Sequence, residues 1–176
     1  NIVQKTKRIW IIMKIIYTLL LSSLLVSCGI YSFTGASIPS EAKTVSVNYF
    51  NNKAATVQPT LSQVFTERLK DMFLEQTNLT LSENEGDLSF SGHISKYQIK
   101  PMAIKANETA GKNRLTIAVK VKYNNSFDAE NNFETTFSRY RDYDSSQNIS
   151  DIEDTLIEEI TNELAEDVFN KAFVNW

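Results

Sequence analysis

The side chain with the most chemistry in this sequence is the thiol of Cys28, the only cysteine among 176 residues. A single cysteine excludes a disulfide within the chain. Cys28 follows an apolar run over residues 15–27, which begins after Met13 and Lys14 and ends at the small side chain of Ser27. A basic start, an apolar middle and small residues at the end are the features of a secretory signal. The sequence therefore predicts a signal peptide that ends just before Cys28.

The segment Leu25-Val26-Ser27-Cys28 is similar to the bacterial lipobox. The resemblance implies that the thiol is alkylated with diacylglycerol, that the chain is cut between Ser27 and Cys28, and that the new N-terminus receives an acyl chain. Several lipid chains anchor a protein stably where one chain does not. One alternative is an uncleaved membrane anchor over residues 9–27, since roughly 20 apolar residues span a bilayer, although Lys14 interrupts that run. The other alternative leaves the thiol free.

Removal of residues 1–27, which carry four basic and no acidic side chains, changes the formal net charge from −3 to −7. Nucleic-acid binding is driven by Lys and Arg side chains that neutralise phosphates. We therefore expect no nucleic-acid partner for this acidic chain. We expect a signal peptide over 1–27 with the true start at Met13 and residues 1–12 upstream of it, a lipidated linker over 28–40, and one globular domain over 41–176.

The sequence shows no set of side chains arranged for catalysis. The resemblance assigns Cys28 to lipid, and the only histidine, His93, lies among serines on the polar side of a predicted strand. No cluster has zinc-ligand spacing, and the five glycines form no phosphate-binding loop. Asp142 and Asp144 are close in sequence, but we interpret them as ordinary loop residues. We expect no enzyme, no metal and no cofactor apart from the covalent lipid on Cys28.

Alternation of apolar and polar side chains predicts four strands. They cover residues 44–50, 86–99, 114–123 and 133–138. Gly92 within the second strand, and the change of its apolar positions after Ile94, predict a bulge or a close backbone approach. The short link after Tyr123 predicts that the last two strands form an antiparallel hairpin.

Apolar residues at spacings of three and four predict two amphipathic helices, over residues 60–77 and 150–173. A capping box, in which two side chains satisfy free backbone N–H groups of the first turn, is predicted at both starts. The pairs with this spacing are Thr60 with Gln63 and Ser150 with Glu153.

The predicted order is therefore β-α-β-β-β-α, which is typical of an α+β protein. Two helices packed on one face of a four-stranded mixed sheet would bury every apolar stripe, and the other face of the sheet would be polar. Strict alternation in the third strand places Arg114, Lys120 and Lys122 on that polar face, opposite the apolar positions from Leu115 to Tyr123. These three side chains are candidate contacts for phosphates or carboxylates of a ligand or partner.

Three segments of the sequence resemble one known family. They are Cys-Gly-Ile-Tyr-Ser-Phe-Thr-Gly-Ala-Ser-Ile-Pro at 28–39, Asn-Arg-Leu-Thr-Ile-Ala-Val-Lys-Val at 113–121 and Phe-Asn-Lys-Ala-Phe-Val-Asn-Trp at 169–176. In this order they are similar to LptE, the lipopolysaccharide-assembly lipoprotein family, in its Bacteroidetes-type branch. The resemblance covers the chain after the signal, and the family's two helices on a four-stranded sheet agree with the predicted order.

The resemblance implies a lipoprotein anchored in the inner leaflet of the outer membrane and facing the periplasm. The family plugs the barrel of LptD, assists its assembly and binds lipopolysaccharide during delivery to the outer leaflet. We therefore expect an LptD-type barrel and lipopolysaccharide as partners, with Arg114, Lys120 and Lys122 as candidate contacts. Two alternatives remain open: a pilot lipoprotein that scaffolds another envelope complex, such as a secretin, and a small carrier of an apolar ligand.

The first prediction concerns lipidation. Mass spectrometry of the mature protein is expected to show an N-terminal peptide that begins with acylated Cys28, because the apolar run and the segment before it are typical of a lipoprotein signal. The variant Cys28→Ser should leave the chain unlipidated, and protease added to whole cells should spare the wild-type protein. Recovery of an intact peptide from Met13 to Ser27 in mature protein would contradict the prediction.

Overall fold

The computed structural model describes residues 38–103 and 111–174. The chain divides into two compact units, residues 1–34 and 35–176, and every described residue belongs to the second. The predicted signal peptide, the cleavage site at Ser27 and Cys28, and most of the predicted linker lie outside the described residues. Within the described ranges, no helix has the length and hydropathy needed to cross a bilayer.

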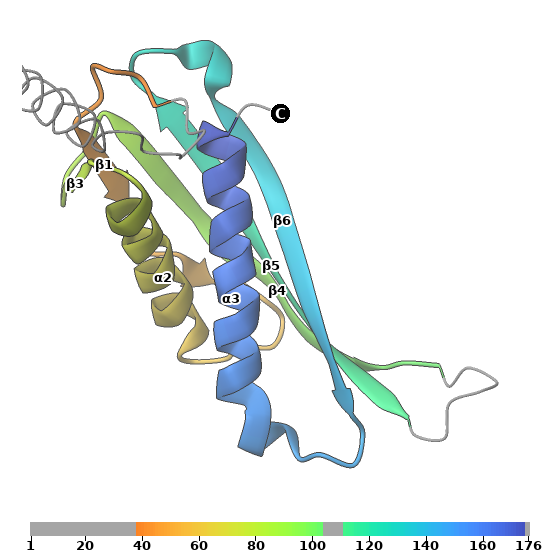
Figure 1. The fold of residues 1–176 in the computed structure, drawn as a ribbon. Helices are drawn as coiled ribbons and strands as arrows, with labels where there is room; N and C mark the ends of the chain where they lie inside the picture. The colour runs from red at the N-terminus through yellow and green to blue at the C-terminus, as the bar shows by residue number, and fades with distance from the viewer. Residues whose placement is uncertain (1–37, 104–110, 175–176) are drawn as a thin grey trace, which may run out of the picture. The chain divides into compact units, whose positions relative to one another are not determined.

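Two helices lie side by side across a mixed sheet (Figure 1). The helices are α2 (Leu61–Gln76) and α3 (Ile149–Phe173). The strands are β1 (Thr44–Val47), β2 (Asn51–Asn52), β3 (Thr80–Leu81), β4 (Leu88–Pro101), β5 (Lys112–Asn125) and β6 (Phe133–Asp144), and a short 3-10 turn, η1 (Ala129–Asn131), precedes β6. The order of the long elements confirms the predicted β-α-β-β-β-α.

The described sheet has six strands, so the predicted number of four is wrong. The strand order is β3-β1-β4-β5-β6, and β2 pairs with β4. The two additional strands, β2 and β3, have only two residues each, which is too short to show an alternating pattern. β1 is parallel to β3 and β4, whereas β4, β5 and β6 are antiparallel, so the predicted mixed sheet and the hairpin are confirmed.

The core lies between the helices and one face of the sheet. β5 contributes alternate residues from Leu115 to Tyr123, and all five are at most 1% exposed. Aromatic rings fill the space between the layers: Phe73 of α2 stacks on Phe90 of β4, with ring centroids 4.5 Å apart, and Phe173 of α3 meets both at an edge. Such aromatic pairs stabilise a core beyond the area they bury.

A bulge in β4 changes which residues face the core. Val119 of β5 pairs with Ile94 and Ala118 pairs with Lys96, so Ser95 is the additional residue. Before the bulge the core receives even-numbered residues, and after it Tyr97 and Ile99 take the core side. Gly92 marks a separate close approach, because a Cβ there would collide with the Lys120 carbonyl and the Phe50 ring. Both features were predicted from the sequence.

The helix starts differ from the predicted capping boxes. Thr60 has helical φ and ψ and its side chain makes no cap; instead the Gln58 Oε1 atom accepts hydrogen bonds of 2.8 Å from the Leu61 and Thr60 N–H groups. At α3 the cap is Asn148, whose side chain accepts from the Ser150 N–H at 3.3 Å. Both predictions were wrong because the side-chain amide of a neighbouring residue, Gln58 or Asn148, accepts the hydrogen bonds from the free N–H groups.

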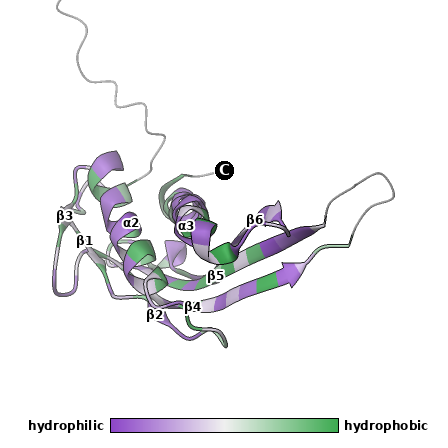
Figure 2. Ribbon diagram, turned by 90° about the horizontal axis from the view of Figure 1, so that it is seen from below, coloured by the Kyte–Doolittle hydropathy of each residue, from purple (hydrophilic) through white to green (hydrophobic). Residues whose placement is uncertain are grey.

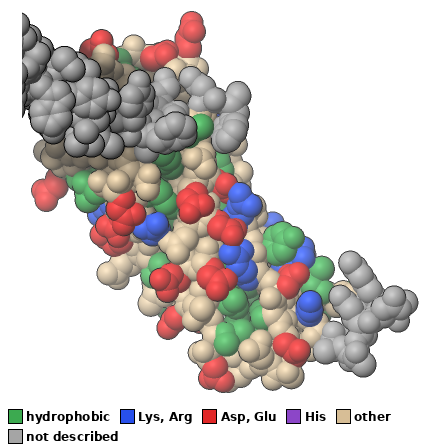
Figure 3. Space-filling view, viewed as in Figure 1, with side chains coloured by type: hydrophobic (Ala, Val, Ile, Leu, Met, Phe, Trp, Pro, Cys, Tyr) green, Lys and Arg blue, Asp and Glu red, His purple; other side chains and the backbone are tan. Residues whose placement is uncertain are grey.

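Two arginines on the core side of β6 hold α3 against the edge of the sheet. The guanidinium of Arg141 donates to Glu159 at 2.7 Å and to Glu163 at 2.6 Å, and that of Arg139 binds Asp167. Figure 3 shows acidic side chains gathered over the helix layer, with basic side chains among them. The Arg141 guanidinium lowers the pKa of the Glu163 carboxyl through its hydrogen bond.

We expect Arg141→Met to lower the free energy of unfolding at pH 7 by about 1 kcal/mol, since partly exposed pairs contribute little. A carboxyl whose pKa is lowered by folding adds stability above its unfolded pKa, about 4.3 for Glu, and loses it as pH falls. The difference between wild type and variant should therefore shrink in urea unfolding at pH 3.5. Lys100→Met is the control, because Lys100 is exposed and forms no salt bridge with a described residue. An undiminished difference at low pH would contradict this account.

Candidate functional site

The face of the sheet opposite the helices is the candidate site, called here the open face. Within the described ranges, both α-helices lie on the other side of the sheet (Figure 2). The register of β4, β5 and β6 puts alternate residues of the three strands on the open face. Its charged side chains are basic Lys96, Lys100, Lys112, Arg114, Lys120 and Lys122, and acidic Glu134, Asp142 and Asp144. The face is therefore net basic on a chain whose net charge is −3.

The three predicted residues are all on this face, but two of them are paired. Arg114 makes a bidentate contact with Asp142 of β6, at 2.7 and 2.8 Å, and its guanidinium lies 3.6 Å from the ring centroid of Tyr140. Lys120 forms a 2.5 Å salt bridge with Glu134. Lys122 is exposed and has no salt bridge with a described residue. Only Lys122 of the predicted three is thus unpaired in the described part of the chain.

The interpretation of Asp142 and Asp144 as loop residues was wrong. Both belong to β6, which continues to Asp144 because its register with β5 is unbroken over twelve pairs. The hydrogen bond from Arg114 lowers the pKa of the Asp142 carboxyl, and the contact with Lys120 lowers that of Glu134. Both carboxyls are therefore ionised at neutral pH and neutralise the two basic partners.

Three basic residues of the open face escaped the sequence interpretation: Lys112, which lies at the start of β5 opposite Asp144, and two lysines of β4. Lys96 lies opposite Ala118 and Lys100 lies opposite Arg114, so both share the open face with the predicted set. A count of every second residue from Leu88 would put both lysines in the core; the bulge at Ser95 turns them outward. The shift of apolar positions to Tyr97 was the signal that could have revealed them.

His93 also lies on the open face, opposite Lys120. Among the described residues, His93 has no partner that would point to catalysis, and no group of three or more His, Cys, Asp or Glu side chains could hold a metal ion. The arrangement is suited to binding anions by exposed lysines.

The family model for LptE, described as lipopolysaccharide-assembly, matches residues 42–172. This chain belongs to the LptE family. The match covers α2, all six described strands and α3 except its last residue, so the resemblance to the LptE family is confirmed. LptE proteins act in lipopolysaccharide assembly.

Two solved lipoproteins resemble this structure at low sequence identity. A minor lipoprotein from Acinetobacter baumannii is 14% identical, with a TM-score of 0.50 over 74% of this chain and 91% of that one. The rare lipoprotein B from Shewanella oneidensis is 13% identical, with a TM-score of 0.43 over 73% of this chain and 92% of that one. No curated protein sequence shows significant similarity to this chain. The first of these likenesses shows the fold alone.

Proposed function

We propose that this LptE-family chain is a lipoprotein of the outer membrane that partners an LptD-type barrel and contacts lipopolysaccharide with its open face. The family match supports a role in lipopolysaccharide assembly. The barrel partner, the outer-membrane location and the residues that touch lipopolysaccharide are parts of the proposal. The protein acts by binding, and we propose no catalytic step.

The observation that carries the proposal is a basic surface on an acidic protein. Anionic lipids attract exposed Lys and Arg side chains by roughly 1 kcal/mol per charge. Neighbouring strands lie about 4.8 Å apart and alternate residues of one strand about 7 Å apart. The lysines of the open face therefore form a two-dimensional array that several phosphates of one lipid A head group can contact together.

Pairing within the open face divides its basic residues into two groups. Lys96, Lys100, Lys112 and Lys122 have no salt bridge with a described residue and are available to phosphates. Arg114 and Lys120 are held by Asp142 and Glu134, so a ligand must displace a carboxylate to bind them. The unpaired lysines should therefore contribute most of the affinity.

Aromatic side chains fill the core at the place where a carrier of apolar ligands would need a cavity. Phe73, Phe90, Tyr123 and Phe173 occupy the space between helices and sheet where an apolar ligand would have to enter. An apolar carrier needs a cavity of several hundred Å³ lined by apolar side chains. The packing of these rings favours a binding role on the surface over a carrier role in the core.

The barrel partnership is tested by co-purification. Mild detergent extraction of the lipidated wild-type protein is expected to recover the LptD-type barrel of the same genome in near-equal amounts, because a plug and its barrel form a stoichiometric complex. Recovery of a secretin in its place would favour the pilot lipoprotein alternative and overturn the proposed partnership.

Lipopolysaccharide binding by the isolated lipoprotein tests the open face. Reversal of two exposed charges in Lys96→Glu with Lys100→Glu should weaken binding roughly tenfold or more, given about 1 kcal/mol per charge and 1.4 kcal/mol per tenfold change. Lys120→Glu with Lys122→Glu should also weaken it, whereas Glu134→Gln should strengthen it by releasing Lys120.

The control for these variants is Lys43→Glu with Lys70→Glu, which makes the same charge change outside the three long strands. Melting temperatures should remain close to that of the wild type, because surface pairs contribute only about 0–1 kcal/mol. If well-folded Lys96 and Lys100 variants bound lipopolysaccharide as tightly as the control, the open face would be ordinary solvated surface.

A further inference from the structure

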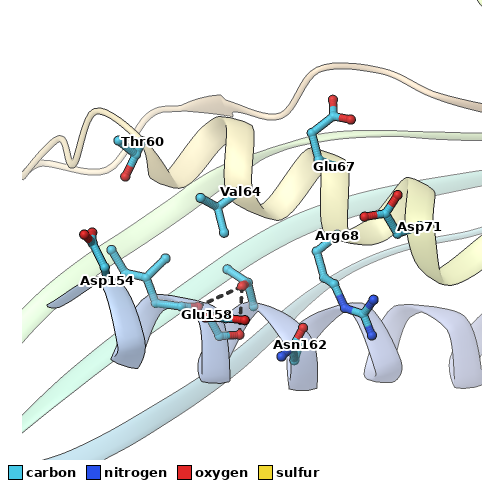
Figure 4. Close-up of a pocket in the computed structure, with 10 residues that line it drawn as sticks. Thr60, Val64, Glu67, Arg68, Asp71, Asp154, Glu158 and Asn162 are labelled. Atoms are coloured by element: carbon cyan, nitrogen blue, oxygen red, sulfur yellow. Dashed lines mark hydrogen bonds between the residues drawn. The ribbon is translucent and has the colours of Figure 1, made fainter. Parts of the chain in front are cut away.

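A groove lies between α2 and α3, in the other layer of the molecule from the open face (Figure 4). Its volume is about 500 Å³, and its floor is apolar because Val64 of α2 and the buried Ile157 of α3 both line it. A second cavity of about 270 Å³, lined by Met72 and Phe169, follows farther along the same pair of helices. Arg68 lines both cavities, so the two are neighbours along the helix pair.

The rims of the groove are acidic. Asp71 lies on the α2 side, and Asp154 and Glu158 lie on the α3 side. None of these three carboxylates forms a salt bridge with a described residue, whereas the acidic residues of α3 nearer β6 are paired with Arg139 and Arg141. The charge of the groove is therefore left without a partner in the described part of the chain.

Arg68 adds an unpaired hydrogen-bond donor to the same groove. Its side chain extends from α2 between the helices (Figure 4), and its terminal nitrogen contacts Glu75 at 3.3 Å. Its Nε is buried and has no hydrogen-bond partner among the described residues. A buried donor without an acceptor is unfavourable, so the Arg68 side chain is not fully satisfied by the described residues.

We propose that the α2–α3 groove docks a Lys- or Arg-bearing polypeptide segment of the protein partner. The occupant's basic side chains pair with Asp71, Asp154 and Glu158, and their aliphatic stems cover the apolar floor. The acidic rims repel an anionic lipid, and the described residues hold no group of three or more ligands for a metal ion. This inference rests on the proposed barrel partnership, and it assigns the protein partner and the lipid to different layers of the molecule.

The test uses the lipidated full chain co-expressed with the LptD-type barrel of the same genome. Asp71→Lys with Glu158→Lys, one change on each rim, should lower barrel recovery at least tenfold. The isolated variant should keep wild-type affinity for lipopolysaccharide and a melting temperature near that of the wild type, because neither carboxylate is paired with a described residue. Val64→Phe, which narrows the groove without changing its charge, should also lower barrel recovery.

The matched control is Glu83→Lys with Glu85→Lys, an equal charge change at exposed positions between β3 and β4. Barrel recovery with the rim variant equal to that with the control would overturn the inference. A lower barrel recovery with Val64→Phe but not with the rim variant would also overturn the inference, because the occupant would then be apolar and not basic. If the wild-type chain itself failed to recover the barrel, both the proposed partnership and this inference would be overturned. If the wild-type chain and the rim variant recovered the barrel equally well, only the inference about the groove would be overturned.

Discussion

The structure depends on one constraint, which is that β5 has an apolar side from Leu115 to Tyr123 and a mainly polar side opposite it. Alternate residues from Leu115 to Tyr123 are buried, and the residues between them include Thr116, Lys120 and Lys122. Each Å² of apolar surface removed from water stabilises the folded state by roughly 25 cal/mol, so a helix layer is favoured only over the apolar side of β5. Both helices therefore pack on the same face of the sheet. The charged side chains of β5 consequently lie on the opposite face, and no other interaction is needed to explain their position.

The same constraint explains how far the sequence could predict the fold. Long elements with a strong period, such as β5, α2 and α3, were predicted with nearly correct ends. The strands β2 and β3 were missed because two residues show no period and are fixed by pairing with distant neighbours. The caps at Gln58 and Asn148 were missed because several side chains near each helix start could satisfy the same N–H groups, and only the backbone path decides among them.

At the candidate site, too, the sequence pattern predicts some features, whereas others depend on strand register and on the bulge in β4. Alternation alone identified Arg114, Lys120 and Lys122 as members of one face, which the register confirms. It could not show that Asp142 and Glu134 neutralise two of them, because that depends on the cross-strand register with β6. Nor could it place Lys96 and Lys100, since their side of the sheet is decided by the bulge at Ser95. The sequence thus located the face but not the charges that remain available on it.

Charge separation between the two layers follows from these placements. α3 carries acidic residues along its length, and those nearest the sheet edge bind Arg139 and Arg141 on the core side of β6. The lysines of β4 and β5 lie on the opposite side of the sheet, separated from that acidic layer by the aromatic core. Interactions between exposed charges weaken beyond about 8–10 Å at physiological ionic strength. The acidic helices therefore do little to reduce the attraction of the open face for anions. A chain with net negative charge can thus present a basic surface suited to a phosphorylated lipid on one side of the sheet. Its acidic helix layer on the other side is suited to a basic protein partner.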